Sequence, residues 1–251
     1  MEKDMEDTNL EENIPEERPF LEKIRILDRA QLKLFAVFCM VIDHLGVIFF
    51  DDALWMRCIG RLAMPIFCFF VAEGYYHTHD RKRYLLRMGL FALISELPFD
   101  LAFYGQFPYW RHQNVMFTFF LAIAAMYAYQ EIMARRSDNV GKILGIAAVL
   151  GCAFLAVFCF TDYNASGVAI VFLFFIMKDR GLLAQNGAVL MYQLFIMGAG
   201  TQAFSMLSSV PLMMYNGEKG RKLKWFFYCF YPAHLLLFGV IARLLIYKIV
   251  D

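Results

Sequence analysis

Long apolar runs separated by short polar connections make up most of this chain. Apolar segments lie near residues 32–50, 55–76, 84–103, 115–133, 142–160, 165–177, 187–200, 201–215 and 225–248. Because a helix needs about 20 residues to cross the hydrocarbon core of a bilayer, this pattern predicts eight or nine membrane-spanning helices. The number depends on residues 187–215, where Gly198, Gly200 and Pro211 interrupt an apolar run that is long for one helix and short for two. We therefore expect an all-α fold, a polytopic helical bundle that forms one domain over residues 32–251.

Two polar segments precede the predicted bundle. Residues 1–18 are rich in Asp and Glu and poor in bulky apolar side chains, which is typical of a solvated, disordered acidic tail. Residues 19–31 alternate basic and apolar positions. This alternation favours a juxtamembrane amphipathic helix that lies on the anionic surface of the membrane.

The composition favours a membrane protein and argues against a nucleic-acid-binding one. Hydrophobic residues make up 60% and aromatic residues 17% of the sequence, and the mean hydropathy is +0.51. These values exceed what a soluble domain carries. The formal net charge is only +1, so no basic surface for nucleic acid is predicted. The six cysteines fall in or beside apolar segments without metal-ligand spacing, and we interpret them as small buried hydrophobic residues.

Basic residues gather in alternate connections between the apolar segments. These connections hold Arg81, Lys82, Arg83 and Arg87, then Arg135, Arg136 and Lys142, then Lys178 and Arg180, and then Lys219, Arg221, Lys222 and Lys224. The connections between them hold almost no Lys or Arg. Since cytoplasmic loops carry the excess of positive charge, the pattern predicts a multi-pass protein of the cell membrane with its N-terminus in the cytoplasm. Nine crossings would place the C-terminus outside.

Several ionisable residues nevertheless fall inside the apolar segments. Asp43 and His44 lie in the first segment, Arg61 in the second, Glu96 in the third and His234 in the last. An ionisable group at bilayer depth costs about 3 kcal/mol on insertion scales, so each needs a partner or water. Their overlapping depths predict a water-accessible cavity between the helices. An ion pair of Asp43 with Arg61 alone is the structural alternative.

The same segments resemble, in order, the signature segments of the TraX family of integral membrane proteins. The matching stretches are LKLFAVFCMVIDH, IGRLAMPIFCFFVAEGYYHT, RYLLRMGLFALISELPFDL, NVMFTFFLA, DYNASG and FYPAHLL, which lie between residues 31 and 240. That family is associated with N-acetylation of the amino-terminal residue of conjugative pilin. It is similar to the superfamily of transmembrane acyltransferases, which use cytoplasmic acyl-CoA to modify an acceptor at or beyond the membrane. The resemblance therefore implies an acetyltransferase that uses acetyl-CoA.

The resemblance also implies a catalytic histidine in the first helix. In the acyltransferase superfamily, a basic residue and a histidine stand there with ten residues between them, and Lys33 and His44 have this spacing. An amine or hydroxyl that attacks a thioester must lose a proton, and imidazole is the usual general base. We therefore expect His44 to accept the proton of the acceptor.

Asp43, Arg61 and Glu96 complete the predicted catalytic group. Asp43 is next to His44 in sequence but points about 100° away around the helix, so we expect it to pair with Arg61. A carboxylate of another helix, Glu96 or Glu73, would orient the His44 ring. The oxyanion formed during transfer needs a hydrogen-bond donor. The candidate donors are Arg61, Asn114 and Tyr163.

Four basic residues at the predicted inner helix ends are expected to hold the phosphates of acetyl-CoA. They are Lys33, Arg81, Arg83 and Arg87. Topology alone also demands basic residues at such positions. On the acceptor side, the candidate binding residues are Asn114, Asp162, Tyr163, Tyr231 and His234. Asn114 and Asp162 are equally suited to capping the helices that follow them. His77 and His79 point in different directions on a helix, so we predict no metal site.

Two other functions fit the same residues. A transporter or lipid-handling protein could use Asp43, His44, Glu96 and Arg61 as a proton or solute relay. A non-catalytic assembly factor for a surface structure is the other alternative. For the acyltransferase, the predicted partners are acyl-CoA, an unidentified acceptor and the lipid bilayer.

Overall fold

The computed structural model describes residues 23–198, 200–221 and 223–250. Every regular element in these ranges is a helix, and the only β-type pairings there are two isolated bridges. The predicted all-α fold is therefore confirmed. The predicted acidic tail, residues 1–18, lies outside the described residues.

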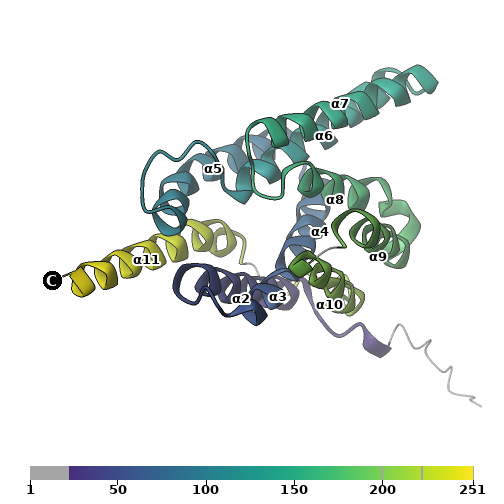
Figure 1. Ribbon diagram of the computed structural model, residues 1–251. Helices are drawn as coiled ribbons and strands as arrows, with labels where there is room; N and C mark the ends of the chain where they lie inside the picture. The colour runs from purple at the N-terminus through teal and green to yellow at the C-terminus, as the bar shows by residue number, and fades with distance from the viewer. Residues whose placement is uncertain (1–22, 199, 222, 251) are drawn as a thin grey trace, which may run out of the picture.

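The helices follow one another through short connections (Figure 1). In chain order they are α2 (Arg29–Phe49), α3 (Leu54–Gly60), α4 (Ala63–Tyr76), α5 (Arg81–Phe103), α6 (Val115–Arg135), α7 (Asn139–Phe158), α8 (Asn164–Ile176), the 3₁₀ turn η1 (Lys178–Arg180), α9 (Gly181–Tyr192), the π-helical η2 (Gln193–Met197), the 3₁₀ helix η3 (Gly200–Ser208), α10 (Ser209–Met213) and α11 (Lys224–Val250).

Five helical stretches are long and apolar enough to cross a membrane. They are Arg29–Phe49, Leu54–Tyr76, Val115–Arg135, Asn139–Phe158 and Trp225–Leu245. The chain is therefore an α-helical membrane protein. Residues 187–215 do not form the two regular spanning helices that we predicted, because this part is divided among α9, η2, η3 and α10. The break between η2 and η3 lies between Gly198 and Gly200, and Gly200 has a positive φ of 59°, which glycine adopts readily.

Asp and Asn side chains set the starts of several helices. At the start of α2, the Asp28 side chain accepts from the backbone N–H of Gln31, and the Gln31 side chain accepts from the backbone N–H of Asp28, which together form a capping box. The side chains of Asp80 and Asp138 likewise accept from a backbone N–H, that of Arg83 at the start of α5 and that of Gly141 at the start of α7. Asn114 accepts from the N–H of Met116, which confirms its predicted role as the cap of α6.

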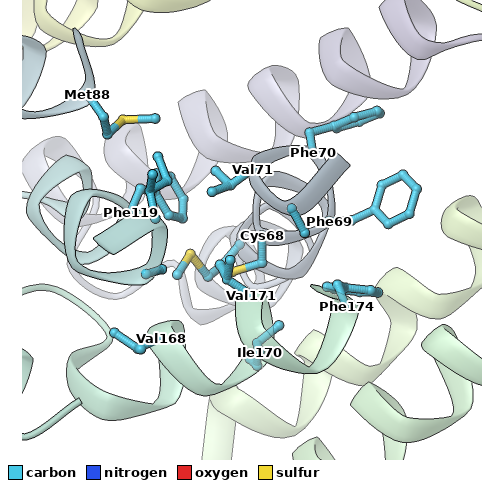
Figure 2. Close-up of a cluster of buried hydrophobic side chains, with 14 of the residues drawn as sticks. Cys68, Phe69, Phe70, Val71, Met88, Phe119, Val168, Ile170, Val171 and Phe174 are labelled. Carbon is cyan, nitrogen blue, oxygen red and sulfur yellow. The ribbon is translucent and has the colours of Figure 1, made fainter. Parts of the chain in front are cut away.

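Helix α4 lies at the centre of the bundle. It packs against α2, α6 and α8, and most of its side chains are buried. Figure 2 shows its middle turns between α5 and α6 on one side and α8 on the other, with the labelled side chains Cys68, Phe69, Phe70, Val71, Met88, Phe119, Val168, Ile170, Val171 and Phe174. The packing of these apolar and aromatic side chains holds the four helices together, and the polar groups described below lie on these helices and their neighbours.

Residues 25–28, in the middle of the predicted amphipathic segment, are extended, while Lys23 and Ile24 before them are helical. Leu27 pairs with the chain after α10: its N–H donates to the carbonyl of Met214, and its carbonyl accepts from the N–H of Asn216, both at 2.9 Å. This pairing satisfies backbone groups that a helix over residues 25–28 would bond internally. Residues 19–22 of the predicted helix lie outside the described part of the chain.

The last helix lies beside the first. Helix α11 packs along α5 and also contacts α2, and its C-terminal half extends beyond the rest of the bundle at the left of Figure 1. The starts of α2, α5 and α11 and the end of α4 meet at one end of the bundle, around Arg29, Lys33, Arg87 and Arg221. We call this the basic end.

Candidate functional site

Two histidines, from the first and last described helices, form a hydrogen-bonded pair. His44 Nδ1 of α2 lies 2.8 Å from His234 Nε2 of α11. His234 Nδ1 in turn lies 2.8 Å from the carbonyl oxygen of Phe230, one turn earlier on α11. Phe103 of α5 meets the His44 ring edge-on at 5.3 Å, and Phe230 stacks on the His234 ring. The pair is therefore held in an aromatic surrounding.

The carbonyl of Phe230 fixes the direction of hydrogen bonding along this pair. A carbonyl only accepts, so His234 Nδ1–H donates to it, and the Nε2 atom of the neutral His234 ring must then accept. Consequently His44 Nδ1–H donates to His234 Nε2. The remaining His44 nitrogen, Nε2, is left with a lone pair. The arrangement holds a neutral His44 in the tautomer whose free nitrogen can take up a proton.

Asp43 forms an ion-pair cluster with two arginines from α3 and its end. Its carboxylate lies 2.9 Å from Arg57 Nη1 and 3.3 Å from Arg61 Nη2, which confirms the predicted pairing with Arg61. Arg61 also donates to the Tyr163 hydroxyl at 3.0 Å. Its Nε–H is buried without an acceptor among the described residues. The cluster therefore retains one unused charged donor.

The backbone around Tyr163 is unusual for non-glycine residues. Phe160, Tyr163 and Asn164 have φ values of 53°, 61° and 45°, which lie in the left-handed region that L-residues seldom adopt. Such strain persists only where the surrounding structure demands it. Here it turns the chain between α7 and α8 so that the Tyr163 hydroxyl reaches Arg61.

The carboxylates predicted to orient His44 have other partners. Glu96 accepts from the backbone N–H and the side-chain amide of Asn114, and Asn114 also donates to the Ala92 carbonyl. Glu73 accepts from Arg29 at 3.0 Å and from Tyr215 at 2.7 Å. Both predictions are therefore wrong, because His234 occupies the position beside His44 that we assigned to a carboxylate.

A second histidine site, which sequence reasoning missed, lies at the end of the bundle away from the basic end. His112 Nε2 is 3.6 Å from Asp162 Oδ1, and its Nδ1 contacts the Tyr104 hydroxyl. The Asp162 partner raises the pKa of His112 above its usual 6.5, and Glu96 and Asp100 act in the same direction, while burial opposes them. The side chain of Asp162 therefore does not cap α8 as predicted, since that helix has no side-chain cap.

Two buried carboxylate oxygens near His112 have no partner. Asp100 is fully buried, and while its Oδ2 accepts from the N–H of Tyr109, its Oδ1 accepts from nothing in the described part of the chain. The same holds for Glu96 Oε1. This end of the interior is therefore rich in negative charge and in unused acceptors.

A cavity of about 530 Å³ opens at the basic end. Its mouth is lined by Arg29, Lys33, Arg87, Lys219 and Arg221, and its walls are mostly aromatic and methionine side chains. Val115, Met116 and Tyr231 line its inner part. Because the Tyr231 ring lies 6.3 Å from the His44 ring, the cavity and the histidine pair are neighbours.

The predicted phosphate-binding residues divide into two groups. Lys33 and Arg87 line the cavity, with Lys33 Nζ 4.8 Å from the centre of the Phe70 ring. Arg81 instead lies over the Tyr75 ring, and Arg83 pairs with Asp80 on the surface. Lys219 and Arg221 line the mouth as well, although nothing in their spacing distinguishes them from basic residues that topology alone requires.

A helical membrane protein with a polar interior is the class that this fold and these contacts define. Within that class the chain belongs to the TraX protein family, whose match covers residues 28–242.

Curated relatives cover most of the chain. A probable fimbrial assembly protein FimC of serogroup H1 from Dichelobacter nodosus is 28% identical over 244 residues, which cover 82% of this chain and 92% of that protein. Protein TraX of Escherichia coli is 27% identical over 227 residues, which cover 84% of this chain and 86% of that protein. An uncharacterized protein of Rickettsia prowazekii is 49% identical over 45 residues, 18% of each chain. No solved structure matches this chain.

Proposed function

We propose that this protein is a membrane-bound acyltransferase that moves an acetyl group from acetyl-CoA to an amine or hydroxyl acceptor, with His44 as the general base. One observation carries the proposal: the hydrogen-bond chain from the Phe230 carbonyl through His234 leaves His44 Nε2 as a free base. His234 then acts as the positioning residue that selects the tautomer of His44.

The proposed reaction needs one base and one oxyanion donor. The acceptor nitrogen or oxygen attacks the thioester carbonyl while its proton passes to His44 Nε2. The tetrahedral intermediate collapses, the C–S bond breaks, and the leaving coenzyme A sulfur takes the proton back from the imidazolium. Arg61 is the favoured oxyanion donor because its buried Nε–H has no acceptor in the described part of the chain, whereas the amide of Asn114 is already used twice.

The cavity suits an acyl-CoA in charge and in polarity. Its five basic mouth residues can meet the phosphates, and its aromatic walls can hold the less polar pantetheine arm. With the basic end in the cytoplasm, as the charge pattern favours, the mouth opens where acyl-CoA is found. The thioester would then enter the membrane toward His44 from that side, with the N-terminus cytoplasmic.

The acceptor would approach from the other end. Glu96, Asp100 and Asp162 surround His112 there, and the unpaired oxygens of Glu96 and Asp100 favour a cationic group. This supports an amine, which binds as an ammonium and releases one proton to water before it attacks, over a hydroxyl. The fimbrial assembly name of one relative supports a subunit of a surface structure as the acceptor.

A transport function is the second candidate, and one region favours it. The irregular helices η2 and η3 contain the buried side chains Gln193, Ser205 and Ser208, each with a polar atom that has no partner among the described residues. Broken helices with free polar groups line substrate paths in many transporters. Loss of the hydrogen bond from His44 to His234 should lower acyl transfer, whereas transport does not depend on which tautomer His44 adopts.

The substitution His44→Ala tests the proposal. We expect acetyl transfer to an amine-terminated peptide to fall by about 10²–10⁴-fold, while acetyl-CoA binding to the purified protein is unchanged. His234→Ala should lower transfer less, because water can hydrogen-bond to His44 Nδ1 in its place. If His44→Ala keeps transfer within about threefold of wild type while His234→Ala abolishes it, the roles of the two histidines are reversed. If both keep it, the mechanism fails and the transporter is favoured.

A further inference from the structure

A second cavity at the basic end is lined by Glu73 and adjoins the cavity of about 530 Å³ described above. It has a volume of about 340 Å³ and is formed by the end of α4, the end of α8, the start of α9 and the extended segment before α2. His77 lines both cavities. Nothing in the proposed reaction uses the second one.

Two unpaired cations line this cavity. Arg25 has no carboxylate within ion-pair distance among the described residues, and its Nε–H is buried without an acceptor. Lys178 has no carboxylate partner there either, and its Nζ lies 3.4 Å from the centre of the Tyr76 ring. A buried guanidinium nitrogen without an acceptor costs free energy unless a ligand supplies an oxygen. The cavity is therefore prepared for an anion.

The single carboxylate in the wall is already neutralised. Glu73 accepts from Arg29 and from the Tyr215 hydroxyl, and His77 lies 3.8 Å away. Asp179, the carboxylate next to Lys178 in sequence, does not line the cavity. The charge left to face a ligand is therefore that of Arg25 and Lys178.

The surroundings match the surface of a membrane. Ile26, Ile176 and Leu183, which adjoin the cavity-lining residues in sequence, are 62%, 43% and 60% exposed. On the other side of residues 23–27 lies an apolar surface groove lined by Lys23, Ile24, Ile26, Ser209, Val210, Met213 and Met214. Basic side chains beside exposed apolar ones are what the phosphate and the acyl chains of a lipid require together.

We propose that this cavity binds the phosphate of an anionic phospholipid, with Arg25 and Lys178 as its ligands. Free phosphate offers the same oxygens but no chains for the exposed apolar residues. The proposal is independent of acyl transfer, because it concerns a cavity that the histidine pair does not reach.

Thermal melting of the full-length protein in an uncharged detergent tests this site, since a ligand that binds the folded state raises the melting temperature in a saturable manner. The probes are dioctanoyl-phosphatidylglycerol, dioctanoyl-phosphatidylcholine, inorganic phosphate and coenzyme A. We expect saturable stabilisation by phosphatidylglycerol. Arg25→Gln and Lys178→Gln should each weaken it at least about tenfold. Arg180→Gln is the matched control, because Arg180 lies on the same turn but does not line the cavity, and its affinity should stay within about twofold.

Four results would overturn the proposal. Absence of saturable stabilisation by phosphatidylglycerol, or equal weakening by Arg180→Gln, would show that no specific site exists. Displacement of the lipid by inorganic phosphate at equal affinity would make it a site for soluble anions. Displacement by coenzyme A, together with loss of coenzyme A binding in Arg25→Gln and Lys178→Gln, would assign the cavity to the acyl donor.

Discussion

At the scale of single residues, the interior satisfies most of its ionisable groups in small clusters. Asp43 meets two arginines, Glu73 meets an arginine and a tyrosine, and the two intramembrane histidines meet each other. A lone ionisable group in hydrocarbon is costly, so pairing of this kind is expected wherever such residues occur. Among the described residues, the buried charged atoms without a partner include Arg61 Nε, Glu96 Oε1 and Asp100 Oδ1, and also the Nε atoms of Arg25, Arg29, Arg81 and Arg87. In the proposed function, Arg61 Nε serves the oxyanion and the free oxygens of Glu96 and Asp100 serve the acceptor.

The raised pKa of His112 makes stability depend on pH. Its protonated form gains from Asp162, so this contribution is present in full below the ordinary pKa of 6.5 and is lost as the pH rises through the raised value. Both side chains are about one-third exposed, so solvent screening limits the effect to less than about 1 kcal/mol. The melting temperature should therefore fall by no more than about 2–4 °C between pH 6 and pH 8.

Replacement of the imidazole checks this prediction. His112→Gln should abolish this part of the pH dependence while the remainder of the melting curve against pH keeps its shape. An unchanged pH dependence in His112→Gln would show that other groups produce it.

The residue-level site was predictable only in part. The ion pair between Asp43 and Arg61 was predicted from their matching depths and from the angle between neighbouring side chains on a helix. The partner of His44 could not be predicted, because the sequence determines the height of a residue along its helix but not which helices are adjacent. His112 gave no signal, since a histidine in a polar loop is ordinary until its carboxylate neighbours are known.

At the scale of helices, the approach of α2 to α3 depends on one glycine. A Cβ atom at Gly60 would lie 2.2 Å from the Cβ of Asp43, so any larger residue must push the two helices apart. Asp43, which precedes His44, would move with them, and with it the ion pairs to Arg57 and Arg61.

The substitution Gly60→Ala should destabilise the protein by about 1–3 kcal/mol, as overpacking of a close contact does. Acetyl transfer should fall more than acetyl-CoA binding, because the displaced group is near His44 and far from the basic mouth. Melting temperature and transfer rate, measured side by side, check both effects. Gly151→Ala on α7 is the control, since nothing lies within 4 Å of its added methyl group; equal losses in the two variants would contradict the argument.

The helices themselves were predicted well where the apolar pattern was regular. The first six predicted segments and the last one each correspond to described helices. Within the second of these segments, the chain breaks near Arg61 into α3 and α4, which hydropathy does not reveal. The stretch 187–215 differed most, because glycines and small polar residues permit several backbone forms and tertiary contacts choose among them.

At the scale of the whole molecule, the two ends of the bundle differ in charge. One end presents the basic mouth of the cavity of about 530 Å³, and the other holds Glu96, Asp100 and Asp162 around His112. A phosphorylated donor and a cationic acceptor would thus be drawn to opposite ends and meet at the histidine pair.

Charge removal at the mouth should weaken coenzyme A binding. We expect Lys33→Gln, Arg87→Gln and Arg221→Gln each to raise the dissociation constant by about three- to tenfold at low salt, with smaller effects at high salt because screening reduces exposed charge contacts. Equilibrium binding to the purified protein at two salt concentrations measures this. Arg83→Gln should have no effect, since Arg83 pairs with Asp80 outside the cavity; a loss equal to that of the other three would make the role of these residues one of general surface charge.

Orientation in the membrane can be checked by labelling. In a background without native cysteines, single cysteines at positions 138 and 179 should resist an impermeant thiol reagent added to intact cells, because both positions lie among the basic connections. They should react after the cells are opened. Labelling from outside would reverse the proposed topology and place the cavity mouth away from cytoplasmic acyl-CoA.

The histidine pair joins residues that are 190 positions apart in the chain. His44 is synthesised with α2, long before His234 is made with α11. During biosynthesis, the nascent chain therefore lacks the tautomer lock until α11 has inserted and found its place between α2 and α5. A polypeptide that stops before α11 would lack one wall of the cavity and would leave the His44 ring free to adopt either tautomer, so the proposed base forms only after α11 has been made.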